Sequence, residues 1–166
     1  MSFYYHLSLL IHITTAMFWL GGMLFFVAVI IPISRKKMYE KFRSSLINQI
    51  GTRFSRMSWG AFGLLLITGI TNLLTKGFSL SDLVTAQFWK SGYGSTLHTK
   101  LHFFILMLIL SAVHDFYIGP KATELMEQQP GTSKTQKYRK TAGWLGRINL
   151  VLGFVIVFYA IKLSRG

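Results

Sequence analysis

Five histidines are the residues of this chain best suited to hold a metal ion or a haem. They are His6, His12, His98, His102 and His114, and all lie in or at the ends of two apolar segments rather than in the basic loops. Ionisable side chains are costly inside a bilayer and usually mark a functional site there. A neutral imidazole can bind a haem iron or a first-row metal ion through a ring nitrogen. The distribution therefore predicts a metal or haem site within the membrane.

Helical geometry gives the relative depth and face of these histidines. At 1.5 Å per residue, His12 lies roughly 9 Å below His6, and His102 lies roughly 6 Å below His98. His12 and His102 then reach similar depths in two helices that enter from the same side. His98 and His102 are about one turn apart and share a face, whereas His6 and His12 are about 120° apart and do not. His114 lies roughly 18 Å further along its helix than His102, near the other side.

Two histidines that face each other across a helix bundle can hold haem b. We predict His12 and His102 as the axial ligands of the haem iron, with His98 as the substitute for His102. Lys100 and His98 would meet the propionates. The full predicted cofactor-binding set is His12, His102, His98, His6, His114 and Lys100, in which His6 or His114 would serve a second haem. Such a protein would be a b-type cytochrome, an oxidoreductase that exchanges electrons with a quinone or a redox protein.

Copper is the alternative to haem at the same residues. The i, i+4 spacing of His98 and His102 suits a first-row metal such as copper or zinc. Met17, Met23 and Met107 lie in the apolar segments, and their thioethers would suit Cu(I). A third interpretation is a small accessory subunit whose histidines only pack between helices.

Asp115 is a further charged residue in an apolar segment. It follows His114, and Arg147, Arg53 and Arg56 are expected at similar depth. Intramembrane charges commonly pair with one another. The simplest expectation is a structural ion pair between Asp115 and one of these arginines, and the alternative is an anion or propionate site.

Four apolar stretches must position these residues. They span about 5–33, 57–74, 97–118 and 144–163, each near the roughly 20 residues that cross a hydrocarbon core. Helices are expected because an isolated strand cannot satisfy its backbone in lipid. The sequence therefore predicts an all-α integral membrane protein, a four-transmembrane-helix bundle that forms a single domain over residues 1–166.

The loops differ in charge, which predicts their orientation. The chain has 18 Lys+Arg against 5 Asp+Glu, a net charge of +13. The cations gather in the first loop (Arg35, Lys36, Lys37, Lys41, Arg43, Arg53, Arg56) and the third (Lys121, Lys134, Lys137, Arg139, Lys140), whereas the second loop holds only Lys90. By the positive-inside rule the first and third loops are cytoplasmic and both termini lie on the outer side. We expect the bacterial inner (cytoplasmic) membrane.

Composition excludes several classes of protein. No cysteine is present, so disulfides, thiolate metal sites and covalently attached haem are excluded. Few acidic residues and no hydrolase triad argue against hydrolytic chemistry. The basic loops fit anionic lipid headgroups, and no groove-reading motif predicts nucleic acid as a partner. Because small membrane cytochromes often sit in larger assemblies, a homo-oligomer or a subunit of a larger membrane complex is also open.

The apolar segments resemble the copper-resistance D (CopD) family. IHITTAMFWLGGMLF is similar to the first helix of that family, where a His precedes a W-x-G-G-like segment. RFSRMSWGAFGLLLITGI resembles its second helix, and SGYGSTLHTKLHFFILMLILSAV its third, including the Y-G and K-L elements. The resemblance covers most of the chain and implies a four-helix, copper-related membrane protein.

A related resemblance is to the HemJ-type protoporphyrinogen oxidases, which are small four-helix membrane proteins that bind haem b. Their first-helix His matches His12, and their H-A-K-L element looks like the stretch His98-Thr99-Lys100-Leu101. Their fourth-helix R-x-x-N-E-x-P pattern is echoed only by Arg147 and Asn149, without the Glu or Pro. This resemblance implies haem binding and, as an alternative activity, a HemJ-like oxidase.

Overall fold

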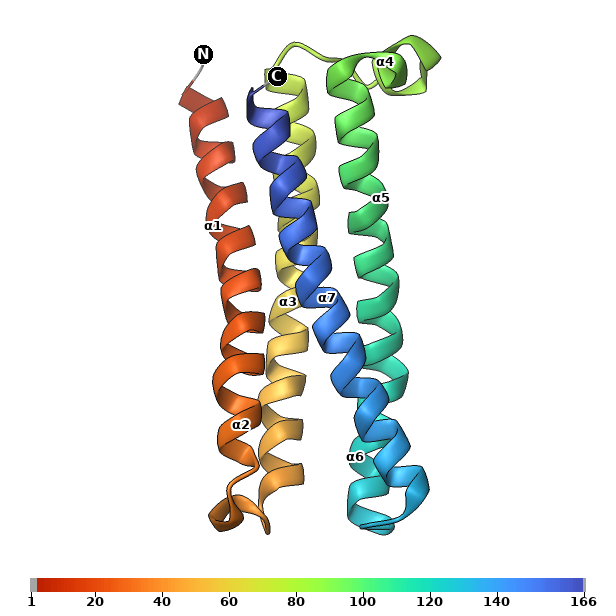
Figure 1. Cartoon of the computed structure of the whole chain (residues 1–166). Helices are drawn as coiled ribbons and strands as arrows, with labels where there is room; N and C mark the ends of the chain where they lie inside the picture. Colours follow the sequence, from red (N-terminus) through yellow and green to blue (C-terminus); the bar gives the residue numbers. More distant parts are fainter. Residues whose placement is uncertain (1–2, 166) are drawn as a thin grey trace.

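Four long apolar helical segments form the described part of the chain, residues 3–165, in a computed structural model (Figure 1). They run Phe3–Ser34, Arg43–Thr75, Gly92–Gln128 and Ser133–Arg165, and each is long and apolar enough to cross a membrane. No strand occurs in these residues. Many large apolar side chains are exposed, among them Leu10, Ile67 and Phe158. The protein is therefore an all-α integral membrane protein built as a four-transmembrane-helix bundle, as the hydropathy predicts.

Two of the four segments change helix type along their length. The first consists of α1 (Phe3–Phe25), the π-helix η1 (Phe26–Ile30) and α2 (Ile31–Ser34), and the third consists of α5 (Gly92–Val113), the π-helix η4 (His114–Ile118) and α6 (Gly119–Gln128). The other two are single helices, α3 (Arg43–Thr75) and α7 (Ser133–Arg165). The connections contain the short helices η2 (Lys37–Tyr39), η3 (Asp82–Val84) and α4 (Ala86–Lys90).

The two π-helices have a common cause. Pro32 follows η1 and Pro120 follows η4, and each proline lies in the first turn of the next helix. A proline ring clashes with the carbonyl four residues earlier and offers no N–H, so the preceding turn must change its hydrogen bonding. The turn widens instead of breaking: the N–H of Gly119 donates to the carbonyl of His114, five residues back.

Both α3 and α7 are longer than a bilayer requires. Each has 33 residues, or about 50 Å at 1.5 Å per residue, against a hydrocarbon core of about 30 Å. Their apolar parts, at about 57–74 and 144–163, are only the later portions of these helices. The first turns of α3 and α7 are polar and extend beyond the apolar part. They can stay helical there because a helix satisfies its own backbone hydrogen bonds, in water as well as in lipid.

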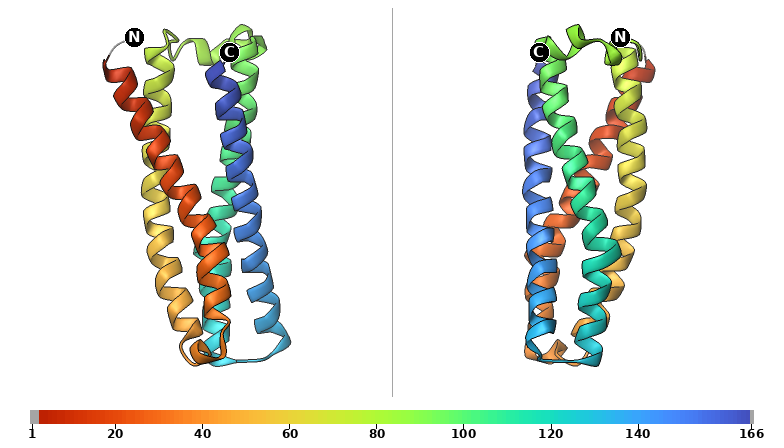
Figure 2. Two further views of the ribbon diagram at one scale, coloured as in Figure 1. Left: turned by 60° about the vertical axis from the view of Figure 1, so that its left-hand side comes forward. Right: turned by 90° about the vertical axis from the view of Figure 1, so that its right-hand side faces the viewer.

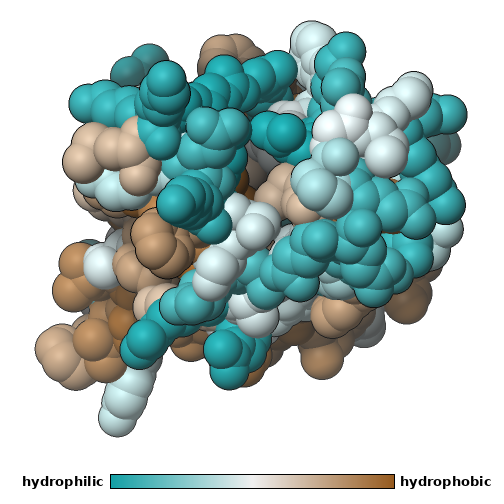
Figure 3. Space-filling view, turned by 90° about the horizontal axis from the view of Figure 1, so that it is seen from below, coloured by the Kyte–Doolittle hydropathy of each residue, from teal (hydrophilic) through white to brown (hydrophobic). Residues whose placement is uncertain are grey.

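The two ends of the bundle differ in charge. Both chain termini and α4 lie at one end, here called the terminal end (Figures 1 and 2). The α2–α3 and α6–α7 connections lie at the other end, here called the basic end. Seen from the basic end, hydrophilic side chains cover much of the molecule and apolar ones lie toward its margins (Figure 3). This separation is what an interfacial, cation-rich end of a membrane bundle requires.

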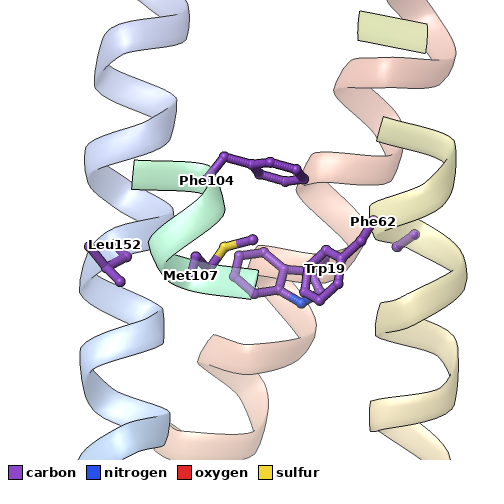
Figure 4. Close-up of a cluster of buried hydrophobic side chains, with 6 residues drawn as sticks. Trp19, Phe62, Phe104, Met107 and Leu152 are labelled. Carbon is purple, nitrogen blue, oxygen red and sulfur yellow. The ribbon is translucent and has the colours of Figure 1, made fainter. Parts of the chain in front are cut away.

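The helices pack as two hairpins, α1 against α3 and α5 against α7, which meet in a central apolar cluster. The cluster consists of Trp19, Ala61, Phe62, Phe104, Met107 and Leu152 (Figure 4). The Trp19 and Phe62 rings are 5.3 Å apart, and Met107 is only 1% exposed. Met107, one of the methionines considered as a copper ligand, is therefore a packing residue of the core.

The hairpins repeat one architecture. Each begins with a helix of 22 or 23 residues, continues through a five-residue π-helix and a proline, and returns as a 33-residue helix. Burial repeats as well: Ser8 and Trp19 in α1 have the same spacing as Thr96 and Met107 in α5. The buried set Ser58, Ala61 and Phe62 of α3 likewise has the spacing of Asn149, Leu152 and Gly153 of α7. The sequence identities at these positions differ, which hides the repeat from inspection of the sequence.

Candidate metal-binding site

His98 and His102 form a pair on an exposed face of α5, near the terminal end. Their ring centroids are 4.2 Å apart. The Nδ1 atom of His102 lies 2.9 Å from the carbonyl oxygen of His98. Because a carbonyl can only accept, Nδ1 must carry the proton and donate it. In the neutral ring, Nε2 of His102 then bears the free lone pair, which is the form that ligates metals.

The start of α5 is fixed by its cap and by α4. The hydroxyl of Ser91 accepts a hydrogen bond from the N–H of Gly94 at 3.0 Å, as an N-cap residue does. A Cβ atom on Gly94 would collide with the carbonyl of Phe88, so the missing side chain allows α4 to lie directly against α5. This contact holds the Trp89 ring 5.6 Å from the His98 ring. The pair thus lies beside an aromatic side chain at the terminal end.

His12 has a different environment, between α1 and α3. Its Nδ1 atom lies 2.8 Å from Oγ1 of Thr68. The single hydroxyl proton of Thr68 is donated to the carbonyl of Leu64 at 2.7 Å, so the hydroxyl oxygen accepts from His12. His12 is therefore also the Nδ1–H tautomer, and its Nε2 is the basic atom. A second polar contact nearby, from Ser8 Oγ to the carbonyl of Thr68 at 3.3 Å, ties α1 to the same turn of α3.

Lys100 lies on α5 between the two exposed histidines in sequence and is partly buried. Its ammonium group interacts electrostatically with His12. Lys100 thus acts on a ring that is partly buried between α1 and α3, whereas the rings of His98 and His102 are exposed. That Lys100 meets a haem propionate stays a prediction.

The structure brings some of the predicted site residues together and separates others. His98 and His102 are neighbours, but no contact joins the rings of His12 and His102 in residues 3–165. His6 lies against the Tyr5 ring, with centroids 5.5 Å apart. Within the described chain no group of three or more His or acidic side chains is arranged to hold a metal ion. The candidate site is thus the His98–His102 pair, and His12 is a separate single candidate ligand.

His114 and Asp115 form a second polar cluster, in the half of the bundle toward the basic end. His114 Nδ1 donates to Asp115 Oδ1 at 2.8 Å. Asp115 Oδ2 accepts from Ser55 Oγ at 2.7 Å and from Trp59 Nε1 at 3.2 Å. The expected ion pair with Arg53, Arg56 or Arg147 does not form among the described residues. Sequence reasoning missed Ser55 and Trp59, whose i, i+4 spacing on α3 was the only available signal.

The protein is a polytopic membrane protein, a four-helix bundle that carries histidines at several depths. Similarity to known proteins identifies its family. Residues 48–163 match the family described as copper resistance protein D, CopD. The chain belongs to the CopD family, which confirms the resemblance seen in its helices.

Two relatives are similar to this chain. An uncharacterised protein of Aquifex aeolicus (strain VF5) is 30% identical over 166 residues, covering 100% of this chain and 99% of that protein. The copper transport protein CutJ of Bacillus subtilis (strain 168) is 28% identical over 127 residues, covering 76% of this chain but only 20% of CutJ. No solved structure matches. Neither relative is described as a haem protein, so the predicted haem and cytochrome function gains no support from them.

Proposed function

We propose that this membrane protein binds copper ions at the terminal end of the bundle and passes them into the membrane domain for transport. Membership in the CopD family and similarity to a protein named for copper transport support a copper-related role. The observation that carries the proposal is the His98–His102 pair, with its close rings and the fixed Nδ1–H tautomer of His102. Imidazole nitrogens are suitable ligands for copper.

In this proposal, copper is the substrate and His98 and His102 are its first ligands. Nε2 of His102 supplies one lone pair. The ring of His98 makes no hydrogen bond to another residue of the described chain, so a ring nitrogen is available to supply a second lone pair. Because the pair is exposed near the end of α5, an ion arriving from that side reaches it without a rearrangement of the helices.

His12 would be the next ligand, within the bundle. Its ring is held by Thr68, and its Nε2 atom is the free donor. The positive charge of Lys100 acts on this ring and would disfavour a cation remaining there. Binding at His12 would therefore be weaker than at the exposed pair, which suits an ion that must leave again.

The charge distribution supports an orientation for this transport. The cation-rich loops at the basic end would face the cytoplasm, and the terminal end with both termini would face outward. Anionic lipid headgroups would then surround the basic end. We propose the bacterial inner membrane as the location, with copper taken up from the outer side.

Copper binding tests the proposal directly. The purified protein in lipid nanodiscs would be titrated with Cu(I) under ascorbate and, separately, with Cu(II). We expect quenching of Trp89 emission on binding, because its ring adjoins His98. A Trp89→Phe variant identifies the contribution of that residue. The double substitution His98→Ala and His102→Ala should weaken binding at least about tenfold, since it removes both proposed ligands.

The matched control is Thr99→Ala, which lies on α5 between the two histidines and should bind copper as the unmodified protein does. In proteoliposomes, copper accumulation should fall in the double variant and persist in the control. Unchanged binding and uptake in the double variant would overturn the proposal. A Soret band in the purified protein that disappears in His12→Ala would favour the haem interpretation instead.

A further inference from the structure

Asp115 is a carboxylate held inside the bundle with both oxygens occupied. Its side chain is 14% exposed. Oδ1 accepts from His114, and Oδ2 accepts from Ser55 and Trp59. An ionised carboxylate only accepts hydrogen bonds, and these three donors stabilise its charged form in a membrane interior. The arrangement therefore holds a fixed negative charge at this depth.

Among residues 3–165, no lysine or arginine forms a salt bridge with this carboxylate. The groups that act on Asp115 in the described chain are His114, Ser55 and Trp59. Two basic residues on the surrounding helices have other partners: Lys121 of α6 pairs with Glu124 at 2.9 Å, and Arg147 of α7 lies over the Trp144 ring at 5.3 Å. Arg53 and Arg56 of α3 lie along a surface groove with Asn48. His114 is therefore the one partner whose charge state can balance the carboxylate.

His114 is prepared to accept a proton. Its Nδ1–H is donated to Asp115, which leaves Nε2 as the basic atom. The side chain is 33% exposed, so it is not sealed within the bundle. It begins the π-helix η4, a wide turn of the kind that recurs at functional sites, and this turn places His114 and Asp115 side by side toward α3.

We propose that His114 and Asp115 form a proton-binding site in the half of the membrane domain toward the basic end. Nε2 of His114 takes one proton from the water at that end. The imidazolium then forms an ion pair with Asp115, and release of the proton to water restores the neutral ring while Asp115 stays ionised throughout. Protonation thus converts a solitary intramembrane charge into a neutral pair, which reduces its electrostatic cost.

A proton fits this site better than a metal ion. Both carboxylate oxygens already accept hydrogen bonds, and Nε2 of His114 is the one nitrogen of this pair with an unused lone pair. No third His or acidic side chain joins the pair within residues 3–165. A proton needs only that one lone pair, and the carboxylate that accepts from Nδ1 balances the charge that the proton adds. The coupling of this proton to copper movement rests on the proposed function, but proton binding itself does not.

Nitrogen-15 NMR of histidine-labelled, copper-free protein in nanodiscs tests proton binding. The His114 signals are assigned by their loss in His114→Gln. At alkaline pH we expect the neutral Nδ1–H tautomer, and on acidification its conversion to imidazolium. In Asp115→Asn, the imidazolium-to-neutral ratio of His114 at pH 6 should fall by about tenfold or more, because the balancing charge is gone.

Ser55→Ala is the matched control, since it removes one hydrogen bond to Asp115 but leaves the carboxylate, and it should change that ratio much less. A His114 ring that stays neutral down to pH 4, or a ratio that is equal in Asp115→Asn and the unmodified protein, would overturn the proposal. Copper titration of the same samples separates the two proposals. Normal copper binding without protonation of His114 would overturn the proton-binding site alone. Protonation of His114 without copper binding would overturn only the proposed copper transport.

Discussion

Three histidines of this protein share one arrangement at the scale of single atoms. In His12, His102 and His114, Nδ1 donates to an acceptor and Nε2 keeps its lone pair. The acceptors differ: a threonine hydroxyl, a backbone carbonyl and a carboxylate. Only the carboxylate brings a charge, and a neighbouring negative charge favours a protonated ring. The same ring orientation therefore fits the proposed copper binding at two positions and the proposed proton binding at the third.

Substitution of Thr68 tests whether the hydrogen bond to Nδ1 supports copper binding at His12. Thr68→Val keeps the shape of the side chain but removes the oxygen that accepts from Nδ1. Loss of such a supporting partner typically lowers metal affinity by about 10–100-fold. We expect a loss in this range for copper at His12, measured in the His98→Ala, His102→Ala background so that only His12 contributes. Thr68→Ser, which retains the hydroxyl, should bind nearly as tightly, and equal weakening in both variants would contradict the argument.

At the scale of the helices, the contact between α4 and α5 determines what surrounds the exposed histidine pair. Gly94 permits the contact because a side chain there would meet the Phe88 carbonyl. The Phe88 ring also packs against Phe78 at 5.3 Å and Trp89 at 5.0 Å. The connection between α3 and α5, which contains α4, thus packs over the end of α5, and this packing positions Trp89.

Substitution of Gly94 should displace this connection. Gly94→Ala places a methyl group where backbone lies, and overpacking of this kind costs about 1–3 kcal/mol. We expect a lower midpoint in thermal unfolding followed by Trp fluorescence, together with weaker quenching of Trp89 by copper. Gly92→Ala is the control, because a Cβ at that position meets nothing within 4 Å. A Gly94→Ala protein as stable as the control would contradict the proposed role of this contact.

The four helices could be predicted from the sequence. The side of each helix that faces the core, and the polar contacts between helices, could not. Lipid requires long apolar helices, so hydropathy identifies four of them. In a membrane, however, apolar residues face lipid and core alike, so the pattern does not reveal that His102 faces outward while His12 faces α3. The partners of Asp115 escaped prediction for a related reason. Ser55 and Trp59 lie about 60 residues away and meet it only when α3 packs against η4.

At the scale of the whole molecule, two similar hairpins meet through a small set of close contacts. A Cβ on Gly153 of α7 would lie 2.8 Å from Cδ1 of Leu20 and 3.0 Å from the Trp19 ring of α1. A larger residue at this position would have to displace the Leu20 and Trp19 side chains, so glycine favours the close approach of the second hairpin to the first. Small residues commonly permit such approach in membrane bundles.

Gly153→Leu should weaken the interface between the hairpins. The bulky side chain has no space against Trp19 and Leu20, so the hairpins must separate locally, at a cost of about 1–3 kcal/mol or more. Gly146→Ala, in the same helix with nothing within 4 Å of its Cβ, should be neutral. Unfolding of both variants in mixed micelles with increasing SDS, followed by circular dichroism, gives the comparison. Equal stability would mean that this contact does not hold the hairpins together.

The pairing of neighbouring helices also bears on how the protein is made. Since α1 packs on α3 and α5 packs on α7, each helix finds its main partner among residues synthesised close to it. Contacts of this local kind form early and quickly. The first hairpin can be complete at the translocon before the second emerges, which leaves docking around Trp19 and Gly153 as the final step of biogenesis. Defects at that interface should therefore yield correctly inserted but unassembled halves, which are substrates for membrane quality control.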